Sequence, residues 1–293
     1  MNNQKTLISI GIPFYNSEAY LGFAINSVLM QTISHWELFL MDDGSTDNSL
    51  EIAKEYAKNE PRIHVISDGK NKGLPTRLNE LSDLATGSYY CRMDADDMMF
   101  NNRLEIQLAY FRAHPETDLL GTGAIAIDNN NQILGLRKGE ANKKVQLHEV
   151  FKGAWVLHPS IMGKTKWFKE NRYDVSLKRA QDYDLWLRTV QKSCFAKLKE
   201  PYLYYREAST STIKKHFVAV QHFINLIWKN VSILGFFSAL KITITSFIKL
   251  NIYILFWLFG QTPVLIARRS QDLDEKSLIY YKKNIFNIAN YKR

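Results

Sequence analysis

Three carboxylates within four consecutive residues, Asp94, Asp96 and Asp97, are the strongest candidates for chemistry in this sequence. Carboxylates at this spacing repel one another unless a cation or several hydrogen-bond donors hold them together. Oxygen ligands of this kind suit Mg²⁺ or Mn²⁺, and both ions also bind phosphate oxygens. The alternative interpretation is an acidic turn that leads into the helix expected at Arg103, because such turns are common at strand ends.

A second polar cluster, residues 42–47 (Asp-Asp-Gly-Ser-Thr-Asp), follows another apolar stretch. Taken alone, it is an ordinary turn in which Thr46 or Asp47 caps the next helix. A carboxylate at this position can also accept a hydrogen bond from a base N–H. A third cluster, residues 13–16 (Pro-Phe-Tyr-Asn), ends the first apolar stretch of the chain.

The elements that would position these clusters alternate between strand and helix patterns. Strands are predicted at residues 7–12, 36–41, 63–66, 89–93 and 119–123. Helices are predicted between them, at residues 17–29, 48–57, 75–84 and 103–113. This alternation predicts an α/β fold with a mostly parallel sheet and helices on both faces. Because ligands bind at the carboxyl ends of parallel strands, we expect the three clusters at one rim.

Beyond residue 123 the pattern changes. Short strands at residues 124–127 and 132–136 flank three asparagines and are expected to form a hairpin. Further elements are predicted as helices at residues 145–151 and 182–191 and as short strands at residues 195–198 and 203–205.

The composition excludes several classes of protein. Of 293 residues, 46% are hydrophobic and 23% are charged, which is typical of a globular protein rather than a disordered one. The two cysteines cannot form a disulfide framework and lack the paired spacing of a zinc site. The sequence has no Gly-x-Gly-x-x-Gly, P-loop, Gly-x-Ser-x-Gly or His-Glu-x-x-His motif, which argues against the enzyme classes that use them.

The net charge of +9 is concentrated at the C-terminal end. Residues 221–293 hold 10 Lys and Arg against 3 Asp and Glu, whereas residues 1–220 hold 28 against 26. This asymmetry favours an anionic surface at one end of the protein over a nucleic acid partner. The change of composition predicts two regions, an α/β domain at residues 1–215 and an apolar, basic helical region at residues 216–293.

The clusters, taken in order with later motifs, resemble the family-2 glycosyltransferases, which use nucleotide sugars and have the GT-A fold. The resemblance covers roughly residues 6–210. Its remaining motifs are Asn71-Lys72-Gly73-Leu74, His158-Pro159-Ser160 and Gln181-Asp182-Tyr183-Asp184-Leu185-Trp186-Leu187-Arg188. The resemblance implies that residues 1–215 are a GT-A catalytic domain with a Rossmann-like sheet.

The resemblance also implies which residues bind the donor. Pro13 and Tyr15 would line the nucleobase pocket. Asp43 would contact the base, with Asp42 beside it, and Asp94 would reach the ribose. The expected donor is a UDP-sugar.

Two further roles follow from the resemblance. Asp96 would coordinate Mn²⁺ or Mg²⁺ at the diphosphate, and Asp182 would be the catalytic base for an inverting transfer. From the residues alone, Asp182 or Asp184 could instead cap the helix that follows. A lone histidine such as His158 is more often a hydrogen-bonded structural residue than a ligand contact.

The resemblance implies a hexosyl or N-acetylhexosaminyl transfer to a saccharide acceptor that is linked to a lipid diphosphate. The expected setting is cell-surface polysaccharide biosynthesis, such as O-antigen or capsule, at the cytoplasmic face of a bacterial inner membrane. The processive members of the family carry a Gln-x-x-Arg-Trp motif, which this sequence lacks. A single transfer is therefore expected.

The C-terminal region predicts membrane association. Residues 250–267 form an uncharged run of 18 residues between basic flanks, and polar residues within it favour a re-entrant or in-plane helix at an anionic membrane surface. A spanning helix, a homodimer contact and simple core packing are the alternatives.

Two other functions remain open at this point. A nucleotidyltransferase shares metal carboxylates and an α/β sheet, although it normally has a glycine-rich basic loop after its first strand. A non-catalytic saccharide-binding or membrane scaffold protein could use the same fold, although the acidic residues argue against it.

Overall fold

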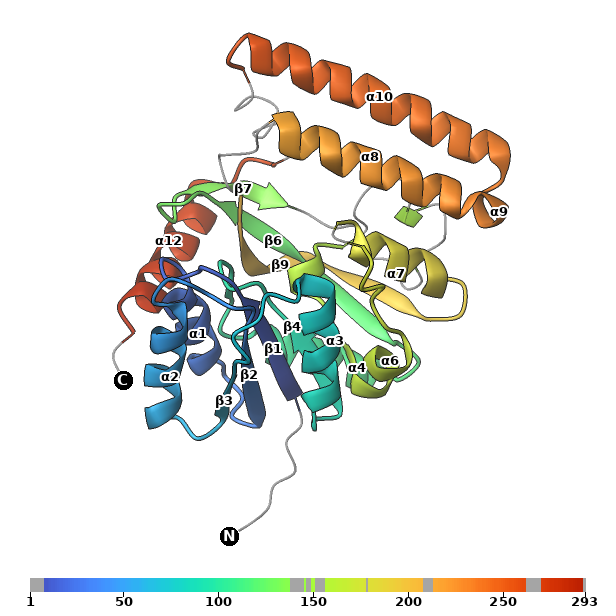
Figure 1. Ribbon diagram of the computed structural model, residues 1–293. Helices are drawn as coiled ribbons and strands as arrows, with labels where there is room; N and C mark the ends of the chain where they lie inside the picture. The colour runs from blue at the N-terminus through green and yellow to red at the C-terminus, as the bar shows by residue number, and fades with distance from the viewer. Residues whose placement is uncertain are drawn as a thin grey trace.

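A nine-stranded mixed sheet forms the centre of the protein (Figure 1). The computed structural model describes residues 8–137, 145, 149–150, 156–177, 179–207, 213–261 and 270–291. The sheet order is β3-β2-β1-β4-β8-β6-β9-β5, and β7 pairs with β6. The strands are β1 (Ile8–Phe14), β2 (Trp36–Asp42), β3 (Ile63–Ile66), β4 (Tyr89–Arg92), β5 (Met98–Met99), β6 (Leu119–Ile127), β7 (Ile133–Arg137), β8 (Met162–Lys164) and β9 (Phe195–Arg206).

The first four strands are parallel. β2 pairs with β1 and β3, and β1 pairs with β4, all in parallel register. β1 and β2 are buried along their whole length, which explains why their sequences are apolar rather than alternating. The expected parallel α/β sheet is therefore confirmed for this half of the fold.

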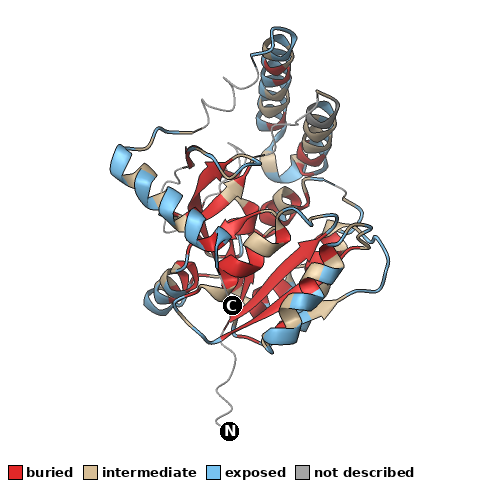
Figure 2. Cartoon of the chain, turned by 90° about the vertical axis from the view of Figure 1, so that its left-hand side faces the viewer, coloured by how far each residue is buried: buried red, intermediate tan, exposed pale blue. Residues whose placement is uncertain are grey.

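Helices cover both faces of the sheet. The helices around the sheet are α1 (Leu21–Leu29), α2 (Ser49–Asn59), α3 (Leu74–Leu84), α4 (Arg103–Ala113), α6 (Thr165–Glu170) and α7 (Gln181–Thr189). Ile8, Ile10 and Ile12 of β1 pack in one core with α1, α2 and α4. Phe39 and Met41 of β2 pack in a second core with α3, α6 and α7. Figure 2 shows the resulting layers, with buried strands between helices whose outer sides are exposed.

The second half of the sheet differs from the prediction in its strand lengths. The two strands expected on either side of residue 123 are one strand, β6, and β9 runs through both strands expected near its ends. Register shifts around Gly123 let β6 and β9 stay paired over this length. The hairpin of β6 and β7 is confirmed. In the helix expected at 145–151, residues 149–150 are helical, and residues 146–148 and 151 lie outside the described residues.

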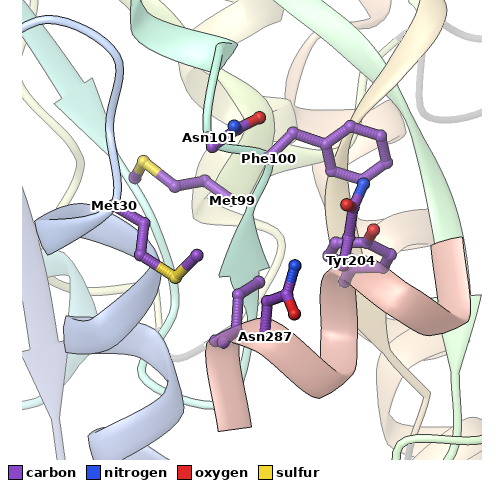
Figure 3. Close-up of a pocket in the computed structure, with 8 residues that line it drawn as sticks. Met30, Met99, Phe100, Asn101, Tyr204 and Asn287 are labelled. Atoms are coloured by element: carbon purple, nitrogen blue, oxygen red, sulfur yellow. The ribbon is translucent and has the colours of Figure 1, made fainter. Parts of the chain in front are cut away.

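The last helix, α12 (Glu275–Ala289), packs against the α/β body. Its Ile285 and Ile288 join a core with residues of β5 and β9, and Asn26 Nδ2 of α1 donates to Ile288 O at 3.0 Å. A cavity of about 50 Å³ remains at this junction, lined by Met30, Met99 and neighbouring side chains (Figure 3). It is far smaller than a pocket for a ligand of nucleotide size. The division at residue 215 stays a prediction.

The C-terminal apolar segment forms helices α8 (Ile213–Lys229), α9 (Val231–Leu234) and α10 (Phe236–Leu258). Among the described residues, only α10 is long and apolar enough to cross a membrane. The helix begins before the uncharged run predicted at 250–267 and includes residues 250–258 of that run. Two glycines with positive φ, Gly235 and Gly260, lie at its two ends. Residues 262–269 lie outside the described part of the chain.

We expect Gly123→Ala to lower the free energy of unfolding by about 1–3 kcal/mol, because a Cβ at this position has no room. It would lie 2.9–3.1 Å from the carbonyl oxygens of Lys199, Arg137 and Glu200, which are fixed in paired strands. Urea unfolding measures the change. Gly22→Ala in α1 is the matched control, with only Tyr56 Oη near, at 3.5 Å. Equal stability of the two variants would contradict the role of Gly123.

Candidate active site

The three polar clusters follow three adjacent parallel strands. Phe14 at the end of β1 pairs with Asp42 at the end of β2. Gly11 of β1 pairs with Arg92, the last residue of β4, so Asp94 follows directly at the same edge. The strand order thus brings the clusters to one rim, at the carboxyl ends of β2, β1 and β4.

Hydrogen bonds join the loops after β1 and β2. Thr46 N donates to Asn16 Oδ1 at 2.8 Å, and Asn16 N donates to Ser45 Oγ at 3.1 Å. Glu18 N donates to Asp47 Oδ2 at 3.0 Å. Asn16 has φ 49°, a left-handed conformation that asparagine tolerates better than most residues. The two loops therefore form one rigid wall of the rim.

Asp43 is held by donors from the following segment. Its Oδ1 accepts from Lys72 N at 2.7 Å and from Arg77 Nε at 2.9 Å. Its Oδ2 accepts from Gly73 N at 3.1 Å, which leaves this oxygen with acceptor capacity for a ligand. The neighbouring Asp42 accepts from Ser45 N at 2.9 Å through Oδ1.

Arg77 is the centre of a buried ion-pair network. It is 1% exposed and also contacts Asp68 at 2.6 Å and Glu80 at 2.8 Å. Pro13 is buried in β1, whereas Tyr15 is 49% exposed beside it. An exposed aromatic ring at this rim is available to stack on a planar ligand.

The carboxylates of Asp94, Asp96 and Asp97 come together after β4. One ligand oxygen from each lies within 4.8 Å of the others. Burial, reinforced by the charge of Asp94, raises the pKa of Asp96 to about 6, and burial raises the pKa of Asp97 well above its ordinary value. Asp97 Oδ2 is buried without a hydrogen-bond partner in the described part of the chain. The donor set and this orphaned oxygen fit a hard divalent cation.

Two arginines hold the acidic cluster. Arg92 is 2% exposed and donates through Nη2 to Asp94. Arg206, at the end of β9, donates its backbone N–H to Asp97 Oδ1 at 2.8 Å and its Nε to Asp96 O at 2.9 Å. Its guanidinium also lies 4.1 Å above the ring of Tyr20. Sequence reasoning missed Arg206, because no local pattern links it to residues more than a hundred positions earlier.

Asp182 is the second residue of α7, directly after Ala180 and Gln181. Burial raises its pKa, the charge of Arg92 opposes this shift, and the charge of Asp94 adds to it. The charges of Arg92 and Asp94 thus both act on the Asp182 carboxylate. The N-cap residue of α7 is Ala180, with φ 59° and no side-chain cap bond. Asp182 is therefore not the N-cap residue, but it lies in the first turn, where a carboxylate favours the helix dipole, and it accepts a hydrogen bond from the backbone N–H of Tyr183.

The nearby Asp184 has a different partner. It is 1% exposed, and its Oδ2 accepts from Arg188 Nε at 2.7 Å within the same helix. Within the described part of the chain, Asp184 forms an ion pair and Asp182 forms none, so the two acidic residues of α7 differ.

His158 lies under the site as a structural residue. Its Nε2 is 2.8 Å from Tyr173 Oη, and burial lowers its pKa well below the ordinary value. The imidazole is neutral at pH 7 and packs edge-on against Trp186. Trp167 fills the same core and donates Nε1 to Ser193 Oγ at 2.8 Å.

Comparisons with known proteins agree on one family. A model of Glycosyl transferase family 2 matches residues 9–172. An uncharacterized glycosyltransferase of Methanocaldococcus jannaschii, MJ1057, is 33% identical over 234 residues, which cover 77% of this chain and 81% of the relative. Escherichia coli WfgD, named UDP-Glc:alpha-D-GlcNAc-diphosphoundecaprenol beta-1,3-glucosyltransferase, is 30% identical over 63% of this chain and 70% of its own.

Two solved structures share the fold. S. aureus TarS 1–349 in complex with UDP-GlcNAc has a TM-score of 0.63 at 20% identity, over 77% of this chain and 66% of the TarS 1–349 chain. The match thus covers just under two thirds of that TarS chain. The mannosyltransferase PcManGT from Pyrobaculum calidifontis, in complex with GDP-Man and Mn²⁺, has a TM-score of 0.58 at 13% identity, over 98% of this chain and 87% of its own. The expected GT-A fold is confirmed by these neighbours.

We expect Mn²⁺ to bind the wild-type protein and to bind the Asp96→Asn variant at least tenfold more weakly, as measured by calorimetry at pH 7.5. Ligation needs the ionised carboxylate, and the pKa of Asp96 is raised to about 6. Protons therefore compete with the cation below this pH, and affinity should fall about tenfold between pH 7 and pH 5.

The control for this experiment is Asp83→Asn, which removes an exposed carboxylate that pairs with Arg172 on α3's outer side. It should bind Mn²⁺ as the wild type does. An affinity that is independent of pH between 5 and 7, or unchanged in Asp96→Asn, would contradict the assignment of the cation site.

Proposed function

Because the chain belongs to glycosyl transferase family 2, we propose that it transfers one sugar, with inversion, from a nucleoside-diphosphate sugar to a saccharide acceptor. The observation that carries the proposal is the grouping of Asp94, Asp96 and Asp97 at the rim, directly after β4. The proposed donor is a UDP-sugar, supported by the UDP-GlcNAc complex of TarS. The transferred group is a hexosyl or N-acetylhexosaminyl unit.

The proposed role of Asp182 is that of general base. The acceptor hydroxyl oxygen forms a bond to the anomeric carbon while the bond from that carbon to the diphosphate oxygen breaks. Asp182 takes the hydroxyl proton, and the nucleoside diphosphate leaves with the bonding electrons. A single attack from the face opposite the leaving group inverts the anomeric centre, so no second carboxylate is required as a nucleophile.

The transfer also requires that the negative charge on the departing diphosphate be neutralised. The residues that would hold a divalent cation are Asp96, together with Asp94 and Asp97 in the same cluster. A bound Mn²⁺ or Mg²⁺ would neutralise charge on the departing diphosphate, in line with the Mn²⁺ complex of PcManGT. Arg92 lies beneath this position and keeps Asp94 oriented through its hydrogen bond.

We assign the nucleoside to the wall formed by the loops after β1 and β2. Pro13 and Tyr15 would line the base, and Asp43 would accept from a base N–H through Oδ2. Asp42, next to Asp43, would support this wall through its hydrogen bond from Ser45 N. Asp94 would reach the ribose. The exposed ring of Tyr15 and the free capacity of Asp43 Oδ2 support this assignment.

The proposed acceptor is a saccharide on a lipid diphosphate, and the proposed setting is cell-surface polysaccharide synthesis, such as O-antigen or capsule. The diphosphoundecaprenol-linked acceptor in the name of WfgD supports this assignment. Peripheral association with the cytoplasmic face of the inner membrane is proposed from the apolar, basic region at residues 216–293, beyond a catalytic domain at residues 1–215.

A panel of sugar nucleotides with Mn²⁺ tests the reaction class. We expect a UDP-sugar to give the largest rise in thermal stability and to release UDP when an acceptor is present, because the diphosphate is the leaving group. Release of pyrophosphate instead would favour a nucleotidyltransferase. Donor binding without turnover on any acceptor would favour a saccharide-binding scaffold.

We expect Asp182→Asn to lower kcat by about 10²–10⁴-fold while donor affinity stays within about twofold, because an amide cannot take the acceptor proton. UDP release measures kcat, and calorimetry with UDP measures binding. Asp184→Asn is the matched control on the same helix and should keep a kcat near that of the wild type. Full turnover by Asp182→Asn would refute the base assignment.

A further inference from the structure

Helix α10 has an apolar face that no described element covers. Its other side packs on α8, where Ala239, Leu250 and Tyr253 are buried. Opposite them, six apolar side chains recur at helical spacing and are 37–84% exposed. This outer face of α10 consists of Phe237, Leu240, Ile244, Ile248, Leu255 and Leu258. In Figure 1 α8 lies between α10 and the α/β body, so the outer face points away from the molecule.

The charges around this face have one sign. Residues 213–261 contain five lysines and no acidic residue. Lys241 lies on α10 at the edge of the outer face, and Lys249 lies on the flank of the helix between the outer face and α8. An apolar stripe with basic residues beside it is complementary to an anionic bilayer, where apolar side chains enter the acyl boundary and lysines meet the headgroups.

We propose that the outer face of α10 docks on an anionic lipid bilayer with the helix axis in the plane of the membrane. The helix has 23 residues and is therefore about 35 Å long, and the whole length of its apolar stripe can contact lipid. Docking itself does not depend on the transfer reaction. The further idea that docking brings a lipid-linked acceptor to the site rests on the proposed function.

The attachment of α10 to the body argues against a membrane-crossing orientation. Trp228 Nε1 of α8 donates to Thr243 Oγ1 of α10 at 3.1 Å, and this contact would lie at membrane depth in a crossing helix. Lys249 would also lie near the middle of the hydrocarbon, where a charge is expensive. In the plane of the membrane, both residues stay on the water side or at the headgroups.

A second copy of the chain fits this face less well than a bilayer does. A symmetric contact places the same surface patch of both copies together, so the basic edge of the face at Lys241 would enter the contact from both copies. Like charges in such a contact are unfavourable, whereas anionic headgroups neutralise them.

Docking would also orient the candidate active site. Phe223 of α8 packs edge-on against Tyr183 of α7 with ring centroids 5.4 Å apart. Lys229 at the end of α8 lies 3.4 Å from Asp174, in the segment before α7. Because Asp182 precedes Tyr183, a bilayer bound to α10 would hold the proposed base within two helix layers of the membrane surface. An acceptor carried by a lipid would then reach it without leaving the membrane.

Co-sedimentation of the full chain with vesicles tests the proposal. We expect the wild type to pellet with vesicles containing phosphatidylglycerol and to bind vesicles of phosphatidylcholine alone less tightly. Ile244→Gln combined with Leu255→Gln should weaken binding at least tenfold, because two apolar side chains lose their burial in lipid. The matched control is Ile279→Gln with Phe286→Gln, which changes two exposed apolar residues of α12 and should bind as the wild type does.

The proposal would be overturned if the wild type did not bind vesicles, or if the two double variants bound them equally well. It would also be overturned if the wild type were a dimer, the α12 variant remained a dimer and the α10 variant were a monomer. The last result would assign the face to a second copy. UDP release with a water-soluble acceptor keeps the reaction separate from docking. The α10 variant should retain this activity. If the wild type and the α10 variant both failed to release UDP, the result would count against the proposed function and not against docking.

Discussion

Electrostatic repulsion among three carboxylates is the constraint on which the site depends. Oxygens of Asp94, Asp96 and Asp97 within 4.8 Å of one another are unfavourable unless positive charge and donors surround them. The fold supplies Arg92 from β4 and Arg206 from β9, and both are fixed by strands rather than by flexible loops. Burial first, and the neighbouring carboxylates second, raise the pKa values of Asp96 and Asp97 against the opposing charge of Arg92, so a bound cation would favour their ionised forms.

The same balance of charge extends to Asp182. Burial raises the pKa of this carboxylate, Arg92 lowers it and Asp94 raises it further, so the proposed base and the proposed cation site share one electrostatic environment. Burial keeps water from weakening these interactions. This arrangement would favour group transfer. Neighbouring groups held by the sheet would stabilise the charge that develops on a leaving diphosphate and would accept the proton from an acceptor.

The helices beyond the sheet divide into two sets with different environments. α12 returns to the α/β body and completes a core with β5 and β9. α8 and α10 instead project from the body, and α10 keeps a long apolar face outside the core (Figure 2). A globular body that exposes an apolar stripe of this length, interrupted only by the polar Asn251 among the outward positions of α10, is typical of a protein that works at a surface. The contact of Phe223 with Tyr183 joins that surface to the helix that carries Asp182.

The sequence by itself determined the parallel half of the sheet and the grouping of its polar clusters. Buried strands with short helical crossovers leave a strong local pattern, and the rule that ligands bind at strand carboxyl ends then placed residues 13–16, 42–47 and 94–97 at one rim. Only the tertiary structure decided that Arg206 holds Asp97, that Asp43 pairs with Arg77, and that β9 runs unbroken past Pro201. These features depend on partners distant in sequence, and a contact between distant residues leaves no periodic signal in either segment.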